Sequence, residues 1–80
     1  MSRRKVEYDR EADAMYISLS DKPYAYTKSL DDMRYVDYAI DDTPIGIELL
    51  AISDGVDVRD LPNMKEIIHL LESRQIKIYA

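Results

Sequence analysis

Short runs of alternating apolar and polar residues fill the first fifty positions, and a polar turn closes each run. Side chains alternate between the two faces of a strand, so this period of two predicts strands with one apolar face. Five such runs cover residues 6–8, 13–19, 24–30, 35–40 and 45–49. The segments between them are rich in Asp, Ser and Pro, which favour turns. We therefore expect an antiparallel β-meander of about five strands.

Four of the five runs offer an apolar face to a common core. The inward positions are Val6, Tyr8, Met15, Ile17, Leu19, Val36, Tyr38, Ile40, Ile45, Ile47 and Leu49. The opposite face then carries Ala14, Tyr16, Ser18, Tyr35, Asp37, Ala39, Gly46 and Glu48. For residues 24–30 the pattern leaves the inward face open.

A helix follows the predicted strands. Pro62 and the pair Asn63 and Glu66 are competing start signals, and either start gives a helix that runs to about Ser73. At about 100° per residue, one apolar stripe holds Leu61, Met64, Ile67, Ile68 and Leu71, with Leu70 at its margin and His69 on the polar side. The alternation of residues 76–79 predicts a short terminal strand that can add to a sheet edge. The expected fold class is α+β, with the helix packed on one face of the sheet.

Chain length limits this fold to a single domain over residues 1–80, because 80 residues with 46% hydrophobic content build one core rather than two. The chain contains no cysteine, so disulfides cannot reinforce so small a domain. We therefore expect a symmetric homodimer. Its first expected contact is the face of Tyr16, Tyr35 and Glu48, and its second is the edge formed by residues 76–79.

The formal net charge of −5 argues against direct binding to a nucleic-acid backbone and favours a basic or neutral protein partner. Arg3, Arg4 and Lys5 form a local basic cluster, which we expect to be a solvated chain end. The amino-terminal residues lack the apolar segment of a secretion signal. The most apolar window, residues 45–52, is far shorter than the roughly 20 residues that span a bilayer. These features predict a cytoplasmic protein without membrane contact.

Few residue types suited to catalysis are present. His69 is the one histidine and there is no cysteine, so hydrolytic triads and zinc centres lack members. Two glycines cannot build a glycine-rich phosphate loop, and we expect no cofactor. Four turn aspartates, Asp31, Asp32, Asp41 and Asp42, could hold a hard cation if their turns met. We favour turn chemistry, because aspartate side chains accept hydrogen bonds from nearby backbone N–H groups, and we expect no metal.

Two motifs, YDREADAMYI over residues 8–17 and PIGIELL over residues 44–50, resemble the small prokaryotic family catalogued as domain of unknown function 2283. Residues 55–58, the following helix and residues 76–80 are similar to its longer members, so the resemblance spans nearly the whole chain. It implies a compact sheet-and-helix protein without an established activity. Some relatives are encoded beside small toxin-like proteins, and this gene neighbourhood implies an antitoxin or accessory role. One departure is Ser73-Arg74-Gln75, where relatives place a glycine to end the helix.

Tyr16, Tyr35, Asp37 and Glu48 share the polar sheet face and form the candidate interaction or ligand-binding group. Other motif residues, Tyr8, Asp9, Asp13 and Gly46, are assigned structural roles, with the two aspartates fixing the first turn. The leading hypothesis is a non-enzymatic protein-interaction module, antitoxin-like or regulatory. The alternative is a small enzyme or ligand-binding protein that uses Tyr16, Glu48 and Asp37 as acid/base or hydrogen-bonding groups.

Overall fold

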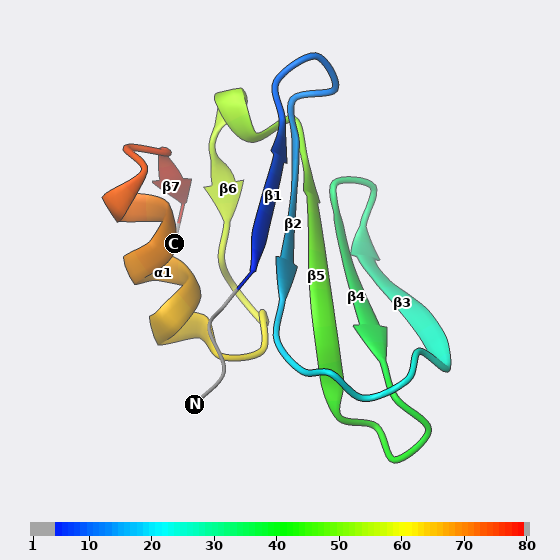
Figure 1. The fold of residues 1–80 in the computed structure, drawn as a ribbon. Coiled ribbons are helices and arrows are strands. Elements are labelled where there is room, and N and C mark those ends of the chain that lie inside the picture. The colour runs from blue at the N-terminus through cyan, green and yellow to red at the C-terminus, as the bar shows by residue number, and fades with distance from the viewer. Residues whose placement is uncertain (1–4, 80) are drawn as a thin grey trace.

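A five-stranded antiparallel sheet forms one layer of the structure, and a helix with a two-stranded ribbon forms the other (Figure 1). The computed structural model describes residues 5–79. The sheet contains β1 (Val6–Asp9), β2 (Ala14–Ser18), β3 (Tyr26–Asp31), β4 (Arg34–Tyr38) and β5 (Pro44–Leu50). The second layer contains a 3-10 turn (Ile52–Asp54), β6 (Val56–Asp57), α1 (Met64–Ser73) and β7 (Ile78–Tyr79). The expected α+β class, with five antiparallel strands and one C-terminal helix, is confirmed. Arg3 and Arg4 lie outside the described residues.

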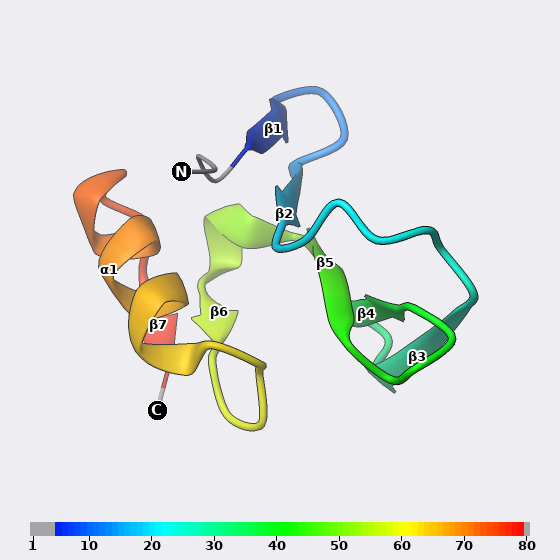
Figure 2. The ribbon, with the colours of Figure 1, turned by 60° about the horizontal axis from the view of Figure 1, so that its bottom comes forward.

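The strand order of the sheet is β1-β2-β5-β4-β3. Strands β3, β4 and β5 follow one another as a meander, but β2 pairs with β5 and not with β3. The link over residues 19–25 therefore leads from the middle of the sheet to its far edge (Figure 2). Lys22 Nζ donates to Asp41 Oδ2 at 2.6 Å and to Thr43 Oγ1 at 3.2 Å, which ties this link to the β4–β5 turn.

One face of the sheet and one stripe of the helix form the core (Figure 2). The buried cluster contains Met15, Ile17, Val36, Ile47, Leu49, Ile52, Val56, Val58, Leu61, Ile67 and Leu71. Strand pairing places Ile17, Ile47 and Val36 side by side across β2, β5 and β4. The inward positions expected for β2 and β5 are thus confirmed.

Helix α1 begins after Asn63, so the Asn63 start prevails over the Pro62 start. Of the predicted stripe, Leu61, Ile67 and Leu71 are buried and Ile68 is half-buried. The prediction was wrong for Met64, which is 43% exposed. It is the first helical residue, and Leu61 from the preceding turn is buried at that end of the helix instead.

The prediction was also wrong for Ile40, which follows the end of β4. The register between β4 and β5 shifts between Asp37 and Tyr38, which marks a bulge. The extra residue is on β5, because Asp37 pairs with Gly46 whereas Tyr38 pairs with Pro44. Strand β4 ends at Tyr38, and the Asp42 N–H donates to Ala39 O at 3.0 Å in the turn that follows. Ala39 is buried there, whereas Ile40, which the alternation placed in the core, is 89% exposed in the turn.

The helix ends without a glycine. Gln75 takes the left-handed conformation, with φ at 60°. Its N–H donates to Glu72 O at 3.0 Å, and the Ile76 N–H donates to Leu71 O at 2.9 Å. These two bonds are those of a Schellman motif. Gln75 thus occupies the position where relatives were expected to place glycine.

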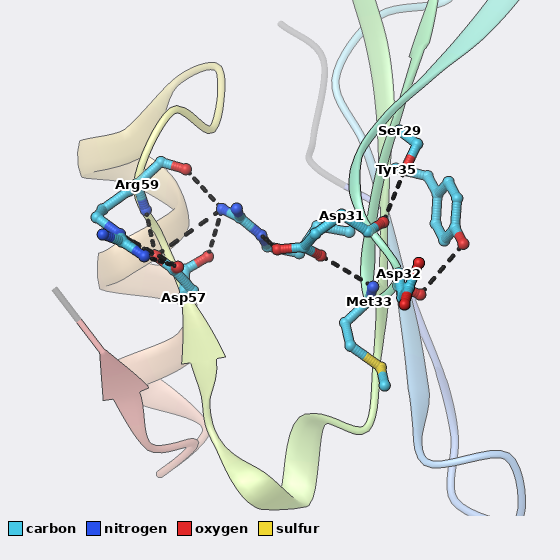
Figure 3. Close-up of polar contacts among 8 residues, drawn as sticks. Ser29, Asp31, Asp32, Met33, Tyr35, Asp57 and Arg59 are labelled. Carbon is cyan, nitrogen blue, oxygen red and sulfur yellow. Dashed lines mark hydrogen bonds and ion pairs between the residues drawn. The ribbon is translucent and has the colours of Figure 1, made fainter.

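The terminal strand β7 pairs in parallel with β6 rather than with an edge of the large sheet. On its other side, β6 has a side chain rather than a strand as its partner: Arg34 Nη1 donates to Asp57 O at 3.0 Å and to Arg59 O at 2.6 Å. Arg34 Nε also donates to Asp31 Oδ2 at 2.9 Å. Figure 3 shows Asp57 and Arg59 facing Asp31 across the gap between the layers. This buried arginine therefore joins the two layers.

Candidate functional site

The sheet face that is turned away from α1, here called the open face, carries a continuous row of side chains. Direct strand pairing aligns Glu7 of β1, Tyr16 of β2, Glu48 of β5, Tyr35 of β4 and Ser29 of β3. Asp37 is two residues after Tyr35 on β4, so it is on the same face, and it pairs with Gly46 of β5. The structure therefore brings the four candidates Tyr16, Tyr35, Asp37 and Glu48 together on one face.

Tyr16 reaches across a neighbouring strand. Its hydroxyl donates to Asp37 Oδ2 at 2.7 Å, although β5 lies between β2 and β4. The ring crosses β5 above Gly46, where a Cβ atom would lie 1.8 Å from Tyr16 Oη. Asp37 Oδ1 accepts a second bond from Thr27 Oγ1 at 2.6 Å. Residues from β4 and β3 thus hold the hydroxyl of the Tyr16 ring where the ring crosses the backbone of β5.

Burial, followed by the hydrogen bond to Asp37, raises the pKa of Tyr16 far above its usual value of 10. The negative charges of Asp37, Glu48 and Glu7 raise the pKa further, because each disfavours a phenolate nearby. The Tyr16 hydroxyl therefore stays protonated at neutral pH, with its donor group committed to Asp37.

Glu7 and Glu48 are the residues paired with Tyr16 on the two neighbouring strands, and both are exposed. Within residues 5–79, neither carboxylate has an ion pair or side-chain hydrogen bond. A shallow hollow of about 730 Å³ lies beside them and continues along the β1–β2 turn. Its lining includes Glu7, Glu11, Glu48, Arg10 and Tyr16, so carboxylates outnumber the cation.

Tyr35 lies on the other side of Glu48 and is half-buried. Its hydroxyl donates to the backbone oxygen of Asp32 at 3.1 Å, as Figure 3 shows. This bond also holds the second tyrosine of the row in one orientation.

The remaining motif residues lie around the first turn and β5. Asp9 Oδ1 accepts the Ala12 N–H at 3.1 Å. Asp13 has φ at 54° and accepts two bonds from Ser53, from its N–H at 3.0 Å and from its Oγ at 2.6 Å. Tyr8 is on the sheet face opposite the open face and is 48% exposed. Asp13 therefore links the β1–β2 turn to the 3-10 turn that follows β5.

The four turn aspartates do not meet. Asp31 and Asp32 precede β4, whereas Asp41 and Asp42 follow it. Asp31 accepts bonds from Met33 and Arg34. The Lys22 ammonium, with Thr43, lowers the pKa of Asp41 to about 2. Over residues 5–79, the structure contains no group of three or more metal-binding side chains placed to share an ion.

The sequence pattern did not lead us to predict a role for two residues, Glu7 and Arg34. Glu7 belongs to the open-face row, and its place between the inward Val6 and Tyr8 was the available signal. Arg34 is only 8% exposed and holds β6. It shares the strand parity of Val36, so the alternation already placed an arginine at an inward position.

Over the described residues, no helix is long and apolar enough to cross a membrane. Comparison of the chain with curated proteins and with solved structures gave no match. A family model described as "Protein of unknown function (DUF2283)" matches residues 5–53, which contain the whole five-stranded sheet. The match ends at Ser53, so it does not extend over β6, α1 and β7 as the resemblance in the sequence suggested. Because it covers more than half of the 80 residues, the chain belongs to this family of proteins of unknown function, DUF2283.

Proposed function

We propose that this chain is a non-enzymatic protein-interaction module and that the open face is its binding surface. The observation that carries the proposal is the row of Glu7, Tyr16, Glu48 and Tyr35 on a sheet face that the second layer leaves uncovered. Tyrosines that combine a large ring with a bonded hydroxyl are enriched at protein interfaces. An antitoxin-like or regulatory partner is the form of this role that we propose.

The state of Tyr16 favours binding over catalysis. A general acid or base works best when its pKa lies near the working pH. The pKa of Tyr16 is raised well above 10, and its hydroxyl is bonded to Asp37. His69, the residue type most often used for proton transfer, is exposed on α1, in the layer behind the sheet. The open face therefore offers fixed contact groups rather than a proton-transfer pair.

A photo-crosslinking amino acid placed at Ser29, which ends the row, tests the proposal in native cells. The matched control carries the same group at Glu72, which is exposed on α1. We expect a protein adduct from position 29 that position 72 does not give. The captured protein, once identified and purified, should bind the wild-type chain and should bind the Tyr35→Ala variant more weakly. Equal adducts from both positions, or none from position 29, would contradict an interface on the open face.

The alternative role, a small enzyme or ligand-binding protein, is favoured by one observation, the hollow lined by Tyr16 and Glu48. In that role Tyr16 and Glu48 would contact a small molecule directly. Tyr16→Phe and Glu48→Gln keep the shapes of both side chains, so they separate the two roles. Loss of a cellular phenotype in both variants, with partner binding unchanged, would favour the small-molecule role.

A further inference from the structure

We propose that the gap between β6 and the large sheet holds a binding site for a small neutral carboxamide with a ring-sized apolar body. The apolar body occupies a cavity beside Leu49 and Val56, and the amide group bonds to Arg34 and to a carboxylate next to it. This site is separate from the open face, so the inference goes beyond the interaction role proposed above.

A cavity of about 160 Å³ lies between β6 and the sheet, beside the start of β4 and the end of β5. Its apolar lining comes from both layers and consists of Met33, Leu49, Leu50, Val56 and Tyr79. Leu49 and Val56 are almost fully buried, whereas Met33 and Tyr79 are 49% and 47% exposed. The apolar lining therefore extends from the core to the surface, which gives a ligand a way in.

The size of the cavity suits one ring. An apolar protein cavity of about 150 Å³ holds a benzene molecule. Gly55 also lines the cavity, and the Tyr79 ring occupies the space that a side chain at position 55 would need. The Tyr79 hydroxyl donates to Asp54 O at 2.6 Å, which fixes this part of the wall. A six-membered ring with one small substituent therefore fits.

Arg34 lines the cavity and keeps one donor nitrogen without an acceptor. The residue is only 8% exposed. Its Nε donates to Asp31, and its Nη1 donates to Asp57 O and Arg59 O, but within residues 5–79 Nη2 has no acceptor. Every fully buried side-chain nitrogen in that part of the chain has a partner, so Nη2 has accessible surface. A ligand oxygen can therefore form a charge-assisted hydrogen bond with this group.

The charges around the cavity balance and favour a neutral ligand. Its charged lining consists of Asp31, Arg34 and Asp57, and Arg59 pairs with Asp57 at 2.6 Å. A backbone hydrogen bond from Met33 lowers the pKa of Asp31, and the Arg59 side chain lowers the pKa of Asp57. Both aspartates are therefore ionised at neutral pH, and Figure 3 shows them on opposite sides of the gap. An anionic ligand would meet these two carboxylates.

A cationic ligand would meet the Arg34 guanidinium and Lys77, whose Nζ lies 5.4 Å from the centroid of the Tyr79 ring. A carboxamide is neutral and carries both kinds of hydrogen-bonding group. Its oxygen accepts from Arg34, and its NH₂ group donates to Asp31 or Asp57, because a carboxylate oxygen has more than one lone pair. A hydrocarbon of the same shape makes neither bond.

Four ring compounds of nearly equal shape test the inference: benzamide, benzoate, benzamidine and toluene. Each compound is titrated into the whole 80-residue chain while amide chemical shifts are recorded. The protein variants are Met33→Trp, which adds bulk to the cavity lining, and Ile40→Trp as the matched control outside it. Both positions are exposed, and circular dichroism verifies that both variants are folded.

We expect benzamide to bind with a Kd of about 1 mM, as suits so small a ligand, and to shift the amides of Leu49, Val56 and Asp57. The other three compounds should each bind about fivefold more weakly or worse, since each lacks a hydrogen bond or carries a charge. Met33→Trp should weaken benzamide binding by a similar factor, and Ile40→Trp should leave it unchanged. Equal binding of toluene and benzamide, shifts confined to the open face, or no effect of Met33→Trp overturns the inference.

Discussion

The ring of Tyr16 occupies the space that any side chain at position 46 would need, since a Cβ on Gly46 would lie 1.8 Å from Tyr16 Oη and 2.3 Å from Cζ. Gly46 of the second motif thus leaves the space that the Tyr16 ring of the first motif occupies. Tyr79 and Gly55 repeat the arrangement in the other layer, where a Cβ on Gly55 would lie 2.5 Å from the Tyr79 ring.

Gly46→Ala should destabilise the fold because the new methyl group must displace the Tyr16 ring from its bond to Asp37. Overpacking of this kind costs about 1–3 kcal/mol, and a lost hydrogen bond adds about 1 kcal/mol. Urea unfolding followed by circular dichroism measures the change. In a Tyr16→Ser background, which removes the ring, Gly46→Ala should cost much less. Equal costs in both backgrounds would show that the ring is not the obstacle.

Ile67→Ala and Leu71→Ala should each lower the free energy of unfolding by about 2–5 kcal/mol, because both side chains are almost fully buried between helix and sheet. A loss of this size is enough to unfold a small domain. His69→Ala, on the exposed side of the same helix, should have almost no effect. Thermal melts in the reverse order would contradict the packing of α1.

Arg34→Met should detach β6 from the sheet, since the Arg34 side chain donates to Asp57 O, Arg59 O and Asp31. Hydrogen bonds from a charged group contribute about 1.5–3 kcal/mol, so we expect a loss of that order. Hydrogen exchange should show β6 losing protection before β2 and β5. Arg59→Met is the matched control: its side chain is 70% exposed, so a much smaller loss is expected than for Arg34→Met. Similar losses in both variants would contradict the special role of Arg34.

Alkaline pH should weaken the fold through Tyr26 and Tyr16. The hydrogen bond from Tyr26 to Asp42 raises the pKa of Tyr26 from 10 to about 12. A raised folded-state pKa contributes stability that is complete below pH 10 and is lost as the pH rises toward 12. Urea unfolding across this range should show the decline, and Tyr26→Phe and Asp42→Asn should each reduce it. An identical decline in wild type and both variants would contradict the assignment.

The homodimer expected from the sequence stays a prediction, and light scattering at micromolar concentration tests it. If the dimer uses the open face, Glu7 and Glu48 of two copies approach each other, and like charges disfavour association. Glu7→Gln with Glu48→Gln should then strengthen the dimer. A monomer at every concentration tested would contradict the dimer.

Alternation in the sequence determined much of the core. It placed Met15, Ile17, Ile47 and Leu49 inward, and helical periodicity did the same for Ile67 and Leu71. Burial depends there on a local repeat of two or 3.6 residues, which is visible in any single run of the chain. The same alternation also put Tyr16, Tyr35, Asp37 and Glu48 on one face before their strands were known to be neighbours.

Only the tertiary structure decided which strands are neighbours. Alternation is the same whether β2 pairs with β3 or with β5, and only the pairing with β5 brings Tyr16 over Gly46 to Asp37. Ile40 is exposed because β4 ends at Tyr38, where its pairing with β5 stops, and this leaves Ile40 in the following turn. Arg34 can be buried because two backbone oxygens, 23 and 25 residues later in the chain, accept its hydrogen bonds. These features depend on contacts between distant segments, which a local pattern does not specify.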